Sequence, residues 1–357
     1  MKRIISFDIA RSIAIICVIL CHAVEYRQFS LINSGNFIVS IFSYLTYTTL
    51  FLIERLGVPV FLMLTGALLI NTKKEIKLFQ FYKKKLFPLV ITTEIWIIIN
   101  YFFDVIFFQS GFEIHILLRQ MLFFQDADSR LGHMWYMLMI IGVYIVIPLI
   151  NYIVLHVRKR DLFIIVLFSF LPYLINIFSL FFEFTLNISP IAFGLDFTPL
   201  GGVFLAYVII GYIIYNLKLY RFKKIIMIIS LFSFLFIVLL QTCLFKLGLT
   251  NYNIILWYTD PFILIVTIGL FYLFCSKKNM STQSFCQSFF YQISIKSFAI
   301  YFIHYPVLII LYQLFEYLPI NLIIRSIFLT IFTFTCSYII SSILMKNKKV
   351  SLILFGR

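Results

Sequence analysis

The chain has 357 residues, of which 62% are hydrophobic and only 12% are charged, and its mean hydropathy is +1.04. A composition this apolar excludes an ordinary soluble domain and indicates a polytopic membrane protein. The net charge of +15 does not indicate nucleic-acid binding, because the basic residues form short clusters between apolar runs, as topology signals do.

Hydropathy predicts an all-α fold of about ten transmembrane helices, each needing about 20 mostly apolar residues. The predicted spans are 4–24, 57–71, 86–108, 133–155, 162–182, 200–217, 222–244, 255–275, 294–315 and 320–345. The first resembles a signal peptide, but Asp8 and Arg11 interrupt it and no small-residue cleavage site follows, so we interpret it as an uncleaved span.

The stretch 37–53 is also apolar, but it is rich in hydroxyl side chains. One straight helix over 38–71 would be about 51 Å long, too long for a hydrocarbon core of about 30 Å. Glu54-Arg55 and Pro59 separate this stretch from 57–71. We therefore expect 37–53 to form an outer-face or partly re-entrant helix that leads through a break at Pro59 into the second span. The connection 109–132 is expected to contain a short helix on the membrane surface.

Charge sets the predicted orientation. With the N-terminus inside, the inner segments hold 22 lysines and arginines and the outer segments hold six, with Arg11 inside the first span. This bias predicts that both termini are cytoplasmic, with a domain over 1–345 and a short basic cytoplasmic tail over 346–357.

The first span carries Asp8, Arg11 and His22. Ionisable groups in a membrane helix are costly and usually mark a functional path. Arg11 and His22 differ by roughly 20° around the helix and about 16 Å along it, and Asp8 lies one turn before Arg11. The alternative is an ion pair that fixes helix packing, with an interfacial histidine.

Two further stretches combine small or basic residues. Gly57, Thr65 and Gly66 allow close helix approach, and the preceding Arg55 could contact a substrate from outside. The triplet Lys83–Lys85 precedes the third span. It is either an anchor on anionic lipid or a seat for a phosphate-rich ligand.

Histidines recur in the fourth and ninth spans. His133 leads Trp135 and Tyr136 into the membrane, either as an aromatic-belt anchor or as part of a cavity shared with His22. His304 lies directly before Pro306, where it could bond a carbonyl that the proline leaves unpaired or line the same cavity. Glu94 is a further polar group in the third span. The six cysteines have no metal-ligand spacing, so no metal site is predicted.

In this order, the stretches resemble the acyltransferase 3 family of integral membrane acyltransferases, and most of all the bacterial O-acetyltransferases of surface polysaccharides, such as those of enterobacterial common antigen. The matching motifs are Asp8/Arg11/His22, Gly57-Val58-Pro59 through Thr65-Gly66 with threonine in place of serine, Lys83–Lys85 with Pro88, His133/Trp135/Tyr136, and Ile300/Tyr301/His304/Pro306. Lysines replace the usual arginines of the third motif, and Phe87 departs from its pattern. The likeness covers essentially the whole chain.

The resemblance implies a multi-pass protein of the bacterial cytoplasmic membrane, with no permanently bound cofactor. The donor would be a cytoplasmic acyl-CoA, most often acetyl-CoA, and the acceptor a glycan hydroxyl at the outer face; polysaccharide synthesis machinery is an expected partner. His22 would act as general base, or form an acetyl-histidine, beside Arg11 and Asp8. Lys83, Lys84 and Lys85 would hold the CoA phosphates with Arg11. The cavity would be lined by Arg55, Glu94, His133, Trp135, Tyr136, Tyr301 and His304.

Two alternatives remain open: a glycan or lipid-linked-sugar transporter, and a sensor or assembly subunit without catalysis. Neither would consume acetyl-CoA.

Overall fold

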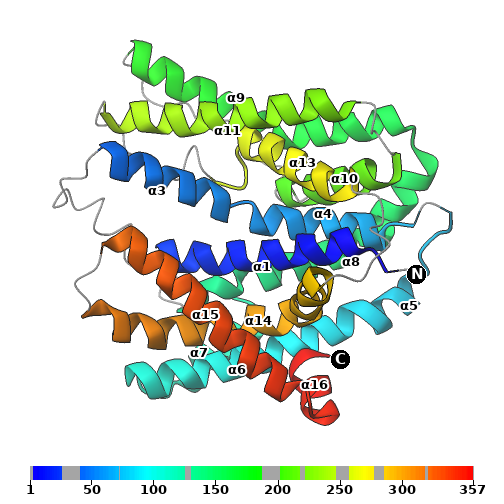
Figure 1. Ribbon diagram of the computed structural model, residues 1–357. Coiled ribbons are helices and arrows are strands. Elements are labelled where there is room, and N and C mark those ends of the chain that lie inside the picture. Colours follow the sequence, from blue (N-terminus) through cyan, green and yellow to red (C-terminus); the bar gives the residue numbers. More distant parts are fainter. Residues whose placement is uncertain are drawn as a thin grey trace.

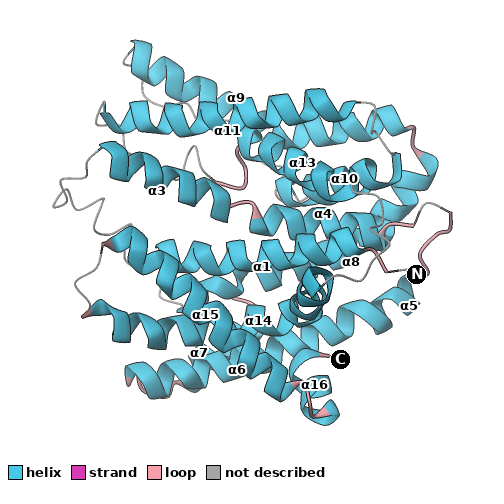
Figure 2. Cartoon of the chain, viewed as in Figure 1, coloured by secondary structure: helices cyan, strands magenta, loops and turns pink. Residues whose placement is uncertain are grey.

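The computed structural model describes residues 3–25, 41–71, 73–124, 130–186, 202–217, 222–246, 257–276, 285–317 and 321–356. Every regular element within these ranges is a helix and none is a strand (Figures 1 and 2). The predicted all-α class is therefore confirmed.

The helices follow one another without a soluble insertion in the described part of the chain. They are α1 (Ile5–Glu25), α3 (Ile41–Glu54), α4 (Gly57–Leu69), α5 (Leu78–Phe81), the π-helix η1 (Tyr82–Leu86), α6 (Phe87–Phe108), α7 (Ile114–Met121), the 3-10 helix η2 (Arg130–Met134), α8 (Trp135–His156), α9 (Lys159–Leu186), α10 (Gly202–Leu217), α11 (Lys223–Lys246), α13 (Pro261–Ser276), α14 (Phe285–Glu316), α15 (Leu322–Leu344) and α16 (Lys348–Phe355).

Helix α1 lies at the centre of the bundle (Figure 1). It packs against α3, α4, α13, α14 and α15, and buries residues on all sides, from Phe7 to Val24. The polar side chains of α1 therefore face protein rather than lipid.

Seven helical segments among the described residues are long and apolar enough to cross a membrane: Ile5–Glu25, Tyr44–Leu69, Leu78–Phe108, Gly132–His156, Lys223–Leu244, Gln287–Phe315 and Leu322–Leu344. Two shorter apolar helices, Gly202–Asn216 and Pro261–Cys275, fall where spans six and eight were expected. The expected span 162–182 falls within α9. The protein is therefore a multi-pass membrane protein, while the count of ten and the side of the termini stay predictions.

The break before the second span lies at the first of the two places expected, Glu54-Arg55, and the span begins at Gly57 as predicted. The break comprises Arg55 and Leu56, between α3 and α4, and does not fall at Pro59. Pro59 occupies the first turn of α4, where backbone N–H groups have no partner within the helix. Proline, which lacks this N–H group, therefore costs the helix no hydrogen bond there. Both halves contact α1, and α3 continues nearly in line with α4 in Figure 1. Residues 37–40 of the expected outer helix lie outside the described ranges.

Glycines set the tightest helix contacts. A Cβ atom on Gly66 would lie 1.8 Å from the carbonyl oxygen of Val208, and one on Gly211 would lie 2.0 Å from that of Met63, so α4 and α10 touch backbone to backbone. A Cβ on Gly57 would lie 2.7 Å from the carbonyl oxygen of Ala14 in α1. The prediction that Gly57 and Gly66 permit close approach is confirmed.

Two short helices complete the bundle. The expected helix in 109–132 is α7, which buries Leu117 and Gln120. The basic tail forms α16, which returns to α6: the indole N–H of Trp96 donates a hydrogen bond to the carbonyl of Leu354 at 2.7 Å, and Phe355 stacks on Trp96. The tail is thus a docked helix over 348–355.

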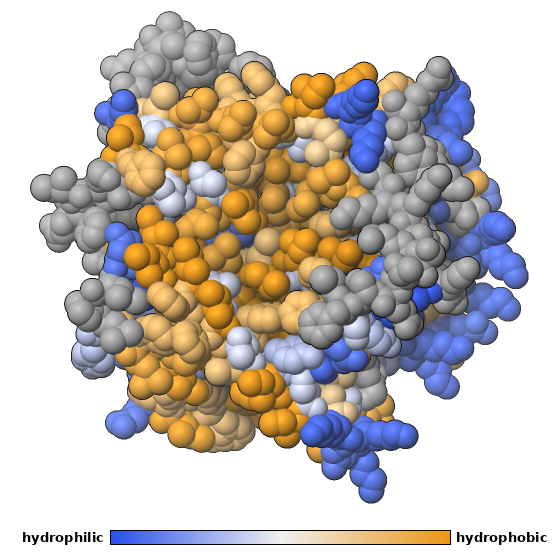
Figure 3. All heavy atoms as spheres, viewed as in Figure 1, coloured by the Kyte–Doolittle hydropathy of each residue, from blue (hydrophilic) through white to orange (hydrophobic). Residues whose placement is uncertain are grey.

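The two chain ends lie toward the same end of the bundle, on the right in Figure 1. Figure 3 shows hydrophobic residues across the middle of this face and hydrophilic residues mainly at that right-hand end. Helix α1 begins at this end and finishes at the opposite one. Its Asp8 and Arg11 therefore belong to the end that carries the chain termini, and His22 belongs to the other.

Candidate active site

Asp8 is buried near the start of α1, and its closest charged partner is Arg3. The Arg3 Nε lies 2.7 Å from one carboxylate oxygen, whereas Nη1 of Arg11 lies 3.8 Å from the other. Ser294 of α14 donates a hydrogen bond to Asp8 at 2.8 Å and accepts one from Arg11 at 3.5 Å. The expected Asp8–Arg11 pair is present, and a serine from α14 bridges it.

Three histidines predicted from separate stretches meet at the other end of α1. The ring centroid of His22 lies 5.3 Å from that of His304 in α14 and 6.5 Å from that of His133 in η2. His133 and His304 are 6.1 Å apart. The structure therefore brings together imidazoles that are 111 and 171 positions apart in the chain. We call His22, His133 and His304 the histidine cluster.

His304 is fully buried, and its Nδ1 bonds to the backbone carbonyl of Tyr301. A ring nitrogen that bonds a carbonyl must carry the proton, so Nε2 keeps a lone pair in the neutral ring. That Nε2 is buried and has no hydrogen-bond partner among the described residues. The carbonyl that Pro306 leaves without a donor is that of Phe302, whereas the observed bond is to Tyr301, so it is not the bond expected from the proline. It occupies one ring nitrogen and leaves the other available for chemistry.

His133 is also buried, and neither of its ring nitrogens has a hydrogen-bond partner in the described part of the chain. The ring of Tyr305 stacks on it at 4.1 Å and also meets His22 edge-on at 5.6 Å. Buried polar atoms are normally satisfied, so orphaned imidazole nitrogens mark a place where a ligand can bond. Tyr305, within the fifth motif, was not among the predicted site residues.

Of the predicted aromatic residues, Tyr301 contacts the cluster directly, with its ring centroid 5.6 Å from that of His304. Tyr136 packs 5.5 Å from Tyr301, whose hydroxyl donates a hydrogen bond to the backbone carbonyl of His133. Trp135 packs 5.5 Å from Tyr258. Glu94 lies on α6 and has no hydrogen bond or ion pair to the histidines within the described residues. Its Oε2 is buried there without a hydrogen-bond partner.

Arg55 lies in the break between α3 and α4 and is only 2% exposed. Its guanidinium forms an ion pair with Glu25 and donates hydrogen bonds to Cys21 Sγ at 3.6 Å and to the Tyr258 hydroxyl at 3.4 Å. The ring of Trp257 covers it at 4.5 Å. Arg55 thereby ties the last turn of α1, which carries His22, to the segment before α13.

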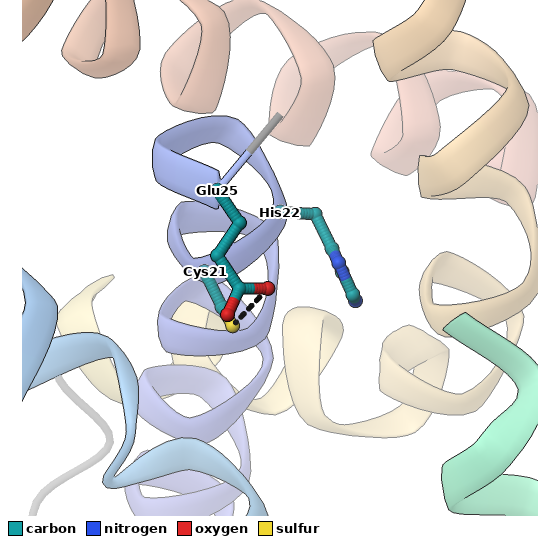
Figure 4. Close-up of side chains that lie close together, drawn as sticks. All are labelled: Cys21, His22 and Glu25. Carbon is teal, nitrogen blue, oxygen red and sulfur yellow. Dashed lines mark hydrogen bonds between the residues drawn. The ribbon is translucent and has the colours of Figure 1, made fainter. Parts of the chain in front are cut away.

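Figure 4 shows this last turn of α1, with Cys21 hydrogen-bonded to Glu25 and His22 pointing away from both. Possible ligand atoms of the three residues lie within 4.8 Å of one another. The carboxylate of Glu25 already accepts a hydrogen bond from the Cys21 thiol and pairs with the cationic Arg55. These contacts explain why the possible ligand atoms lie close together.

The basic triplet Lys83–Lys85 forms the exposed turn η1, directly before α6. This turn lies at the end of the bundle where α1 begins (Figure 1). The lysines therefore lie at the same end of the bundle as Asp8 and Arg11, at the opposite end from the histidine cluster.

Residues 4–342 match the family model of the acyltransferase 3 family, which is described as an acyltransferase domain. The chain therefore belongs to this family and is a multi-pass membrane acyltransferase. No curated protein and no solved structure matches the sequence.

Proposed function

We propose that the protein transfers an acyl group, acetyl in the first instance, from cytoplasmic acyl-CoA to a hydroxyl of a cell-surface or lipid-linked polysaccharide at the outer face of the bacterial cytoplasmic membrane. The histidine cluster supports this proposal most directly: bases from α1, η2 and α14 converge at the opposite end of α1 from Arg11. This separation suits a reaction whose two substrates approach from opposite sides. Polysaccharide synthesis enzymes are the proposed source of the acceptor.

The donor would enter at the end of the bundle that carries Lys83–Lys85. Acyl-CoA carries several phosphate charges, and the exposed ammonium groups of Lys83–Lys85 suit them, with Arg11 deeper along α1. From Arg11 the extended pantetheine arm would have about 16 Å to cover along α1 to reach His22. The thioester would then lie among the histidines while the phosphates stay at the inner surface.

His22 is the proposed general base because it lies half-buried, whereas the other two rings are buried. Its neutral imidazole takes the proton of the sugar hydroxyl as the oxygen attacks the thioester carbonyl. The tetrahedral intermediate then collapses: the C–S bond breaks, and the leaving thiolate takes the proton from the imidazolium. An acetyl-histidine is the alternative route: the unprotonated nitrogen of His22 attacks the thioester, the C–S bond breaks, and the leaving thiolate takes the proton from the other ring nitrogen. The sugar hydroxyl then attacks the acetyl-imidazole and returns its proton to the ring, which leaves as neutral imidazole.

His304 supports either route. The hydrogen bond to Tyr301 holds its ring in one tautomer, 5.3 Å from His22 between ring centroids. Its unpartnered Nε2 can accept a hydrogen bond from His22 or from the acceptor hydroxyl.

The test is transfer of labelled acetyl from acetyl-CoA by the purified protein in a lipid bilayer. The acceptor is surface glycan from the cells that make the protein, with its esters first removed by mild base. We expect His22→Ala to lower the rate by a factor of about 10² to 10⁴. His115→Ala changes an exposed histidine on α7 and serves as the matched control.

Full activity in His22→Ala would contradict the role of His22. Glycan passage across the membrane without consumption of acetyl-CoA would favour the transporter alternative. Mass spectrometry of surface glycan from cells with and without the gene would show whether one acetyl group per repeat is lost.

A further inference from the structure

An aromatic group lies beside Arg55, next to the turn of α1 that carries His22. The ring of Tyr258 lies 5.2 Å from that of Trp257 and 5.5 Å from that of Trp135, between centroids. Tyr258 is buried, whereas both indoles are half-buried. The two tryptophans therefore present surface around one buried phenol. Trp257 belongs to none of the motifs found in the sequence.

The surrounding contacts fix this aromatic group in place. The Tyr258 hydroxyl accepts a hydrogen bond from Arg55, and its backbone carbonyl accepts one from the Tyr207 hydroxyl at 2.8 Å. Asp260 caps the start of α13 by accepting from the backbone N–H of Phe262 at 2.6 Å. Trp257 lies over the guanidinium of Arg55. A site held this way is ordered before a ligand arrives.

The placement connects the tryptophans to the histidine cluster from two sides. Trp135 follows His133 by two residues, at the start of α8. On the other side, Arg55 joins Tyr258 to Glu25 and Cys21, which flank His22 in the last turn of α1. A ring resting on these indoles would therefore lie next to the two segments that carry His133 and His22.

We propose that Trp257 and Trp135 form the acceptor subsite and stack on a pyranose ring of the glycan. This inference rests on the proposed function. Indoles combine a large apolar face with an N–H donor, which suits the apolar C–H face and polar rim of a sugar. The half-buried carboxylate of Glu25 accepts hydrogen bonds from hydroxyls at that rim.

Two other occupants fit less well. The adenine of CoA also stacks on aromatic rings, but the lysines suited to its phosphates lie at the opposite end of the bundle (Figure 1). Tryptophans of an interfacial belt face outward to lipid headgroups, whereas these two converge on a phenol that is 3% exposed.

The first test measures transfer kinetics with the base-treated glycan and acetyl-CoA. We expect Trp257→Ala to raise the KM for glycan about tenfold, with the KM for acetyl-CoA within about twofold of the wild type. Trp257→Phe keeps a ring over Arg55, so its KM values for glycan and for acetyl-CoA should both stay within about threefold of the wild-type values. Phe232→Ala, on the exposed surface of α11, is the control. An unchanged glycan KM in Trp257→Ala would overturn the subsite.

The second test needs no catalysis. The chain has three tryptophans, so Trp96→Phe leaves only Trp135 and Trp257, the two indoles of the proposed subsite. The emission of this variant should change in a saturable manner on addition of the same glycan, and not on addition of acetyl-CoA. An emission unchanged by glycan, or changed only by acetyl-CoA, would overturn the proposal. If the wild type transfers no acetyl to glycan while this emission still responds, the proposed function fails and the sugar subsite stands.

Discussion

The hydroxyl of Tyr301 donates a hydrogen bond to the backbone carbonyl of His133 at 2.6 Å, although the two residues lie 168 positions apart. The backbone carbonyl of Tyr301 in turn bonds to Nδ1 of His304. One tyrosine thus fixes the backbone that carries one histidine and the tautomer of another. The geometry of the histidine cluster depends on this link between α14 and η2.

Tyr301→Phe should lower kcat about tenfold and leave either KM nearly unchanged. The variant keeps the ring and the carbonyl that holds His304, but it leaves the buried carbonyl of His133 without its donor, at a cost of about 1–3 kcal/mol. Steady-state kinetics of acetyl transfer would measure this effect. Tyr317→Phe, at an exposed position after α14, is the control. A wild-type kcat in Tyr301→Phe would show that the position of His133 does not limit the reaction.

Arg55→Ala should destabilise the protein by about 3–5 kcal/mol, because it leaves Glu25 and the fully buried Glu54 without their cation. Arg55→Lys should recover only part of the loss, since an ammonium cannot make the forked contacts to Glu25, Cys21 and Tyr258. Thermal unfolding in detergent would measure both variants.

Arg158→Ala removes an exposed arginine that pairs with Asp161 near the start of α9 and is the matched control. Exposed pairs contribute about 0–1 kcal/mol, so its unfolding temperature should be close to that of the wild type. Equal effects of Arg55→Ala and Arg158→Ala would contradict a structural role for the buried pair.

Gly66→Ala should lower stability sharply, because the new methyl group would meet the backbone carbonyl of Val208 at 1.8 Å and push α4 from α10. Gly142→Ala, in the middle of α8, meets nothing within 4 Å and is the control. Alanine also has the higher helix propensity, so the control should match or exceed the wild type in unfolding temperature. A Gly66→Ala protein as stable as the control would show that α4 and α10 can separate without cost.

The sequence predicted helices and motifs well because both depend on local patterns. Apolar runs located α1, α6, α8 and α15, and small residues at Gly57 and Gly66 indicated close helix contacts. The matching glycine at 211 carried no local signal. It lies in an apolar run like any other, and its contact with Met63 appears only once α4 and α10 are packed.

Partners distant in sequence explain most of the remaining differences. Ser294 bridges Asp8 and Arg11, and Trp257 covers Arg55, yet neither residue stands out in the sequence. The break before α4 does not fall at Pro59, because proline marks a break inside a helix but is tolerated in its first turn. The charge count marked 346–357 only as a basic tail and could not show that Phe355 packs on Trp96. The apolar residues of the tail, at helical spacing, were a signal for a helix that packs on the bundle.

Replacing Lys83, Lys84 and Lys85 by glutamine should raise the KM for acetyl-CoA several-fold and leave the KM for glycan unchanged. The three ammonium groups lie exposed on one turn at the end of the bundle proposed to receive the donor. The wild-type KM for acetyl-CoA should rise with ionic strength, because salt screens exposed charges over about 10 Å at 0.1 M, and the triple variant should lose most of that dependence.

Acetyl-dephospho-CoA, which lacks one phosphate group, makes this test specific for the phosphates. The wild type should prefer acetyl-CoA to the dephospho form, and the triple variant should distinguish them less, because fewer cations remain to pair with the extra charge. Lys223→Gln with Lys224→Gln removes an exposed basic pair at the start of α11 and controls for net charge. If that pair and the triplet have the same effect, the lysines act on the donor only through overall charge, and the phosphates bind elsewhere.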